Sequence, residues 1–123
     1  MARIIDLKTF SDNRGNLTII EKILPFEIKR IFFIYGVDSS ERGGHRHKKT
    51  IQGAVCIQGS CQIWNSNSDG SPLEAFILDN PSKCMLLEPQ DWHKMTNFTS
   101  DAILMVFASE YFDSNDYIYE PYQ

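Results

Sequence analysis

The sequence predicts an all-β fold, either a β-sandwich or a small jelly-roll barrel. Short runs rich in Ile, Val, Phe, Thr and Tyr alternate with clusters of Gly, Pro, Asn, Asp and Ser along the whole chain. No window of about 11 residues or more holds an apolar stripe at helical spacing. Roughly ten short strands fit into the chain, and a sandwich or a jelly roll of this size uses about that number.

The first five predicted strands lie in the N-terminal half of the chain. Each is a run with β-branched or aromatic residues that ends where polar or flexible residues begin. The cluster 38–40 is a predicted turn, and Gly43 and Gly44 then give a flexible backbone that can bend the chain into a barrel. These five strands are residues 3–7, 17–21, 30–35, 45–48 and 52–57.

The last five predicted strands are separated by stronger turn signals. The polar run 65–72 is the clearest loop, and 79–81 and Pro89 mark two further turns. The acidic and aromatic tail 110–123 follows, and we expect its rings to pack on the barrel or on a partner subunit, because so many exposed rings favour association. These strands are residues 61–65, 74–78, 83–87, 92–97 and 102–108.

Length and composition predict one domain over residues 1–123. With 42% hydrophobic and 23% charged residues, the chain can build a core without disulfides or metal. No apolar stretch reaches the roughly 20 residues that span a bilayer, and the N-terminus has no signal-peptide pattern. Cys56, Cys61 and Cys84 form an odd set without a CxxC spacing, so we expect buried thiols in a reducing cytoplasm.

Charge is distributed unevenly along the chain. The net charge of −4 argues against a general nucleic-acid-binding protein. Residues 1–50 nevertheless hold ten Lys and Arg against six Asp and Glu, whereas residues 51–123 hold two against ten. A group of basic residues in the first half has two interpretations: a solvated rim, or the mouth of a pocket for an anion such as a pyrophosphate. Its members are Arg14, Arg42, Arg46, Lys48 and Lys49.

The three histidines are the strongest candidates for chemistry. His45 and His47 are two residues apart, so on a strand both side chains point to the same face. His93 follows Trp92 on a second predicted strand. A lone histidine is usually only a satisfied polar residue, but two on one strand face predict a shared functional site.

Two segments resemble the sequence motifs of cupins. Gly44-His45-Arg46-His47, followed by Gly59, resembles the first motif, in which two histidines line a jelly-roll barrel; 89–97, which contains His93 and Asn97, resembles the second. Metal-binding cupins add a glutamate shortly after the histidine pair. Here the following residues, 48–52, contain no acid and begin with two lysines, so we expect no metal cofactor.

The whole chain resembles a narrower family, the sugar 3,4-ketoisomerases that act on dTDP-4-keto-6-deoxyglucose. The most diagnostic segment is Arg42-Gly43-Gly44-His45-Arg46-His47-Lys48, and matching stretches also occur at 12–17, 25–35, 97–100, 108–113 and 116–118. The resemblance implies a cupin homodimer without cofactor whose N-terminal strands are exchanged. It implies a proton transfer through an enediol, which supplies 3-amino-3,6-dideoxysugars for surface polysaccharide.

The resemblance also implies roles for individual residues. His47 is the expected base and His45 its acid or hydrogen-bonding partner, although which of the two acts as base stays open. His93 is expected to influence the configuration at C4, with the galacto product favoured over the gluco product. The expected substrate-binding residues are Tyr35 and Arg42 for the sugar oxygens, Arg14 or Lys48 for the diphosphate, and Trp92 as a stacking wall or as core filling.

Three alternatives remain on the sequence alone. A nucleotide-sugar 3,5-epimerase uses the same barrel and also removes a proton beside a ketone. A metal-dependent cupin enzyme would use His45, His47, His93 and Gln52 as ligands. A sugar-binding cupin without activity would need only the pocket.

Overall fold

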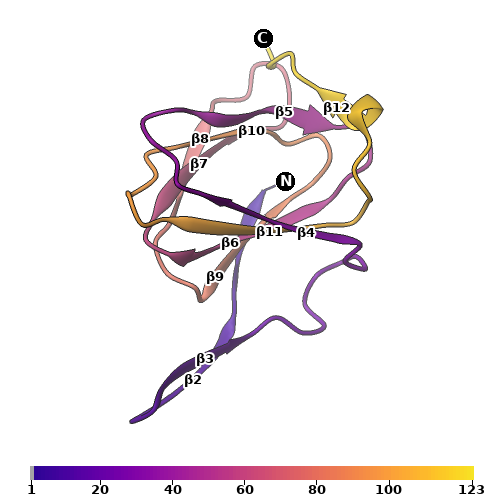
Figure 1. Ribbon diagram of the computed structural model, residues 1–123. Coiled ribbons are helices and arrows are strands. Elements are labelled where there is room, and N and C mark those ends of the chain that lie inside the picture. Colours follow the sequence, from indigo (N-terminus) through magenta and orange to yellow (C-terminus); the bar gives the residue numbers. More distant parts are fainter. Residues whose placement is uncertain (1) are drawn as a thin grey trace.

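Residues 2–123 are described by a computed structural model, and antiparallel strands dominate it (Figure 1). The only helical element in this part of the chain is a short 3₁₀ turn, η1 (Ser114–Asp116). The strands are β1 (Arg3–Asp6), β2 (Lys8–Asp12), β3 (Gly15–Ile19), β4 (Arg30–Tyr35), β5 (Arg42–His47), β6 (Gln52–Gln58), β7 (Cys61–Ser66), β8 (Glu74–Leu78), β9 (Lys83–Leu87), β10 (Trp92–Thr96), β11 (Ile103–Ala108) and β12 (Tyr117–Ile118).

Two five-stranded sheets face each other and enclose the core. One has the strand order β1-β9-β6-β11-β4 and the other the order β12-β5-β10-β7-β8. Many neighbours are distant in sequence, as in a jelly roll rather than a simple meander. The core side chains come from both sheets and include Ile63 and Leu78 from one and Leu104 and Val106 from the other. The predicted all-β barrel is therefore confirmed.

A hairpin of β2 and β3 projects away from the barrel (Figure 1). The sequence predicted only one strand here, at 17–21, and missed β2. Every residue of β2 is exposed, so the segment lacks the buried, alternating pattern on which strand prediction depends. The hairpin exposes two large apolar side chains, with Phe10 at 51% and Leu17 at 57% exposure. Within the single chain, the barrel therefore leaves both side chains of the hairpin uncovered.

The observed strand β5 differs from the predicted strand 45–48 at both ends. It begins at Arg42, because Gly43 and Gly44 stay in the sheet with positive φ angles of 80° each. It ends at His47, and Lys48 lies in a bend beyond it. The prediction that Lys48 belongs to the same strand as the two histidines is therefore wrong. Tyr117 and Ile118 then pair with His47 and Arg46 as the short strand β12, which the sequence did not predict.

The remaining sequence expectations concern the cysteines and the membrane. Cys56, Cys61 and Cys84 are all buried and free, which confirms the expected thiols. Burial raises the pKa of Cys84 to about 11, so this thiol stays protonated and unreactive at neutral pH. Between residues 2 and 123 there is no helix with the length and apolar character needed to cross a lipid bilayer.

Candidate active site

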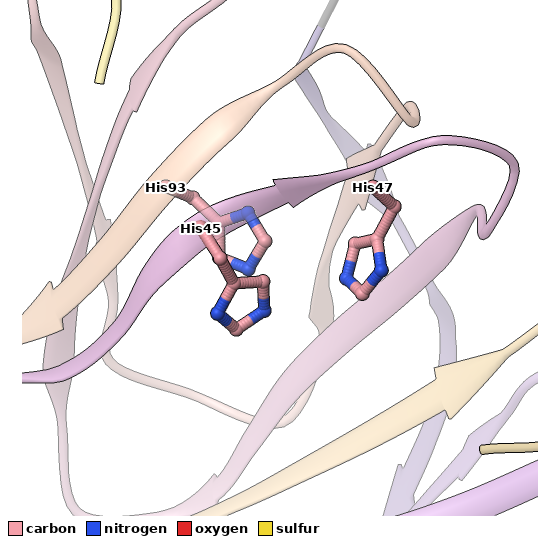
Figure 2. Close-up of side chains that lie close together, drawn as sticks. All are labelled: His45, His47 and His93. Atoms are coloured by element: carbon pink, nitrogen blue, oxygen red, sulfur yellow. The ribbon is translucent and has the colours of Figure 1, made fainter. Parts of the chain in front are cut away.

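Three histidines meet inside the barrel between strands β5 and β10. His45 and His47 project from β5 to one side, and His93 projects toward them from β10 (Figure 2). The backbone register pairs His93 directly with His45. The ring centroid of His45 lies 5.0 Å from that of His47 and 4.8 Å from that of His93. The structure thus brings together the three residues that the sequence singled out.

A glycine-dependent irregularity places His45 opposite His93. The pairing of β5 with β10 shifts register between His93 and Lys94. At Gly43 a Cβ atom would lie 3.1 Å from the carbonyl oxygen of His93, and φ is +80°, a conformation that L-residues with side chains rarely adopt. The glycine therefore allows the two backbones to approach closely at the point where the histidines face each other.

Each of two histidines is anchored through one ring nitrogen. His47 Nδ1 lies 2.9 Å from Oδ2 of Asp116, and His93 Nδ1 lies 3.0 Å from the carbonyl oxygen of Asp91. Carboxylate and carbonyl oxygens only accept hydrogen bonds, so both Nδ1 atoms carry the proton in the neutral rings. The Nε2 atoms of His47 and His93 are buried and have no hydrogen-bond partner within residues 2–123. Two bare nitrogen lone pairs consequently face the interior.

All three imidazoles are neutral at physiological pH. Burial is the largest cause, and it lowers the pKa of His45, His47 and His93 to about 4 each. Repulsion from a neighbouring histidine lowers each value further, while the hydrogen bonds to Gly43, Asp116 and Asp91 oppose the shift. A neutral imidazole with a free lone pair can accept a proton, so the cluster is suited to acid–base chemistry.

Additional polar residues in this interior were missed by the sequence analysis. Arg30 lies on β4 in alternation with the core residues Phe32 and Ile34, and its Nε is buried without a partner. Its positive charge contributes to the lowered pKa of His47. The ring of Tyr117 lies 4.6 Å from that of His47. Both faces of β4 carry apolar residues, so alternation in the sequence could not show whether Arg30 lies on the inner or the outer face of the strand.

The other predicted site residues lie away from the histidines. Tyr35 and Arg42 line one surface hollow together, with Gly36–Asp38 and Ser40, and no histidine lines it. Lys48 is exposed beside Asp113 and Asn115. Trp92 faces the outside of the barrel, where its Nε1 donates to the carbonyl oxygen of Tyr119. It therefore does not form a wall beside the three imidazoles.

Arg14 is the predicted residue farthest from the cluster. It lies near the turn of the β2–β3 hairpin, at the opposite end of the molecule from β5 (Figure 1). Its guanidinium pairs with Asp12 at 2.6 Å, and both side chains are exposed. Arg14 can contact a ligand bound at the histidines only if the ligand sits in a second copy of the chain that the hairpin reaches.

The histidine cluster is also a possible metal-binding donor set. One ring nitrogen from each of His45, His47 and His93 can be chosen so that all three lie within 4.8 Å of one another. Three neutral imidazoles with an open fourth position occur at catalytic zinc sites. The cluster contains no carboxylate, in agreement with the missing glutamate of the sequence motif. These three side chains therefore fit a divalent cation.

Comparison with known proteins places this geometry in a family. Residues 1–123 match the family described as FdtA, WxcM-like, C-terminal. The chain is 41% identical over 119 residues to a TDP-4-oxo-6-deoxy-alpha-D-glucose-3,4-oxoisomerase of Aneurinibacillus thermoaerophilus, covering 94% of this chain and 84% of the relative.

Solved structures give the same relationship. A 3,4-ketoisomerase from Helicobacter canadensis superimposes with a TM-score of 0.91 at 35% identity, over 97% of this chain and 90% of that one. A His-to-Asn mutant of the 3,4-ketoisomerase QdtA from Thermoanaerobacterium thermosaccharolyticum, in complex with TDP-4-keto-6-deoxyglucose, superimposes with a TM-score of 0.90 at 38% identity, over 97% of this chain and 87% of that one.

Proposed function

The chain belongs to the FdtA (WxcM-like, C-terminal) family, and from that premise we propose that it is a TDP-sugar 3,4-ketoisomerase acting on TDP-4-keto-6-deoxy-D-glucose. The product is the isomeric TDP-3-keto-6-deoxyhexose. The observation that carries the proposal is the neutral His47, held at Nδ1 and bare at Nε2, beside two further imidazoles. No cofactor is required for this reaction, because it moves only protons and a double bond.

His47 acts as the base that begins the isomerisation. Its Nε2 removes the proton from C3, and the electron pair of that bond forms a C3–C4 double bond. The carbonyl oxygen at C4 takes a proton from His45, which yields the enediol. The proton on His47 then passes to His45, whose ring centroid is 5.0 Å away, and restores both imidazoles.

His93 completes the reaction and sets the configuration at C4. Its bare Nε2 accepts the proton that leaves the C3 hydroxyl as the new C3 carbonyl forms, and delivers it to C4. The face of C4 that His93 addresses fixes the product, for which we favour the galacto configuration. Substitution His93→Arg changes the ratio of galacto to gluco products in the NMR spectrum; an unchanged ratio would remove this role from His93.

Arg30 stabilises the negative charge that develops on the sugar oxygens. It is a cation on the inner face of β4, with a buried Nε that has no partner in the described chain. A preorganised cation in a site shielded from water stabilises an enediolate more than it would in bulk water. Tyr35 and Arg42, which share the neighbouring hollow, are assigned to substrate contacts outside the barrel interior.

A homodimer completes the substrate site. The β2–β3 hairpin exposes Phe10 and Leu17, and the outer face of the edge strand β4 exposes Ile31 and Phe33. Packing a partner's hairpin on such a face covers both sets of apolar side chains. Arg14 at the hairpin is then available for the diphosphate of a substrate bound to the partner, with Lys48 as the second candidate.

The cellular role follows from the product's chemistry. A ketone at C3 is the substrate that an aminotransferase needs to make a 3-amino-3,6-dideoxyhexose, a building block of surface polysaccharide. We expect the enzyme to work in the cytoplasm, where Cys56, Cys61 and Cys84 stay reduced. The chain accounts for this role as one catalytic domain, residues 1–123.

A metal-dependent cupin enzyme is the second candidate, because the three ring nitrogens lie within 4.8 Å of one another. A divalent ion held by His45, His47 and His93 would polarise the substrate's carbonyl group. Such a metal enzyme could not use His47 as the base, since the lone pair of His47 would be bound to the ion.

Turnover in the presence of a chelator tests the proposal. Purified protein is incubated with TDP-4-keto-6-deoxyglucose and excess EDTA, and conversion is followed by NMR. We expect conversion by the wild type, loss of conversion in His47→Asn, and wild-type rates in Asp79→Asn, which removes one exposed charge between β8 and β9 and serves as the surface control. Conversion that requires added zinc, iron or manganese would support the metal enzyme, and binding without conversion would contradict both.

A further inference from the structure

The side chain of Asp116 lies buried against the candidate base, at 4% exposure. Its Oδ2 accepts hydrogen bonds from Nδ1 of His47 at 2.9 Å and from the hydroxyl of Thr50. Its Oδ1 accepts from the backbone N–H groups of Lys49, at 2.9 Å, and Lys48, at 3.2 Å. Both oxygens are therefore fully used, and the carboxylate has one orientation.

The C-terminal tail brings this carboxylate to the histidine across 69 residues of sequence. Asp113 caps η1 by accepting from the N–H of Asn115, and η1 presents Asp116 toward the barrel. The backbone carbonyl of Asp116 also accepts from the N–H of Lys48 at 2.8 Å, and Tyr117 continues the contact by pairing with His47. Asp116 is thus tied to the end of β5 through backbone as well as side chain.

We propose that Asp116 is a positioning residue that fixes His47 in the tautomer with the proton on Nδ1, so that Nε2 is always the atom that accepts a proton. This inference rests on the proposed role of His47 as the base. A carboxylate cannot donate a hydrogen bond, so the alternative tautomer would leave Nδ1 and Oδ2 as two acceptors facing each other. The arrangement follows the same logic as a base oriented by a buried acid in hydrolases.

Asp116 has a second effect once His47 has taken up the substrate's proton. The imidazolium is positive, and His45 and Arg30 both oppose that charge by lowering the pKa of His47. Asp116 raises the pKa of His47 through its hydrogen bond and its charge. Although burial raises the pKa of Asp116 itself, the hydrogen bonds from Thr50, Lys49 and His47 outweigh burial and keep it ionised at neutral pH.

Substitution Asp116→Asn separates positioning from packing. The backbone N–H of Lys49 donates to Oδ1 and requires an acceptor there, so the amide oxygen takes the place of Oδ1. The NH₂ group must then face Nδ1 of His47 and donate to it, while the hydroxyl of Thr50 can rotate and accept. The proton of His47 moves to Nε2, and the imidazole loses the lone pair that the reaction needs.

The first measurement is the tautomer of His47, read from ¹⁵N chemical shifts of labelled protein. We expect the Nδ1–H form in the wild type and the Nε2–H form in Asp116→Asn. A wild-type His47 that carries its proton on Nε2 would overturn the proposal without any variant. This readout does not depend on turnover, so it remains decisive even if TDP-4-keto-6-deoxyglucose is not converted and the proposed function fails.

The second measurement is steady-state kinetics. We expect Asp116→Asn to lower kcat by about 10³-fold with KM changed little, because binding does not require the proton at either nitrogen. Asp79→Asn, the same change at an exposed acid between β8 and β9, should keep the wild-type kcat. Thr50→Val should lose far less than Asp116→Asn. A kcat of Asp116→Asn within a few-fold of the wild type, in folded protein, would refute the positioning role.

Discussion

The pH dependence of the reaction follows directly from burial of the histidines. An exposed imidazole has a pKa near 6.5 and is roughly 90% protonated at pH 5.5. Burial lowers the pKa of His47 to about 4, so that at pH 5.5 only roughly 3% of this base is protonated. The free enzyme therefore keeps nearly all of its active form at a pH where an ordinary histidine would have lost about nine tenths of it.

The assay is kcat/KM between pH 4 and 8, because this quantity reports ionisations of the free enzyme. We expect a flat profile from pH 8 to about 5, and a fall only as the pH approaches 4. Circular dichroism at each pH shows that the protein remains folded, and NMR titration of the imidazole C–H protons gives the pKa values independently. An acid limb centred near pH 6.5, with folded protein, would refute the buried-base account.

Three other predictions follow from the same structure. Folding lowers the pKa of His93 from 6.5 to about 4, so His93 binds fewer protons in the folded than in the unfolded state. The free energy of unfolding therefore decreases as the pH drops through this window, by up to roughly 3 kcal/mol. Urea titrations of the wild type and of His93→Gln at several pH values measure how steeply each unfolding free energy depends on pH. Gly43→Ala forces a Cβ toward the carbonyl oxygen of His93 at φ +80° and should destabilise the fold by at least about 1 kcal/mol, seen as a lower Tm, whereas an unchanged Tm would contradict the close approach. Phe33→Asp places a charge on the exposed face of β4, at a side chain 54% exposed in one chain, and should convert a dimer to monomer in analytical ultracentrifugation; a wild type that is already monomeric would refute the proposed interface.

Local sequence patterns were sufficient for the barrel and for its histidines. Alternation with period two placed His45 and His47 on one face, and the β-branched runs gave ten of the strands to within a few residues. The hairpin strand β2 was missed because all its residues are exposed, and β12 because two residues carry no periodic signal.

Long-range contacts explain what the sequence could not predict. In the sequence, nothing distinguishes Asp116 from the three other acids of the tail, which are Glu110, Asp113 and Glu120. Only the folded chain shows that the carboxylate of Asp116 contacts His47. Trp92 is a different case: it directly precedes His93, so strand alternation in the sequence already sends it to the opposite face of β10, away from the imidazoles. Arg14 lies on a projecting hairpin, and its proposed ligand contact depends on a second copy of the chain.

The most direct test of the central claim is the origin of the hydrogen at C4. The reaction is run in deuterated water with EDTA, and the product is examined by NMR. Because the proton delivered by His93 comes from the exchangeable C3 hydroxyl, the account predicts deuterium at C4 of the 3-keto sugar and no conversion by His47→Asn. Protium retained at C4, or an active His47→Asn variant, would contradict the three-histidine mechanism.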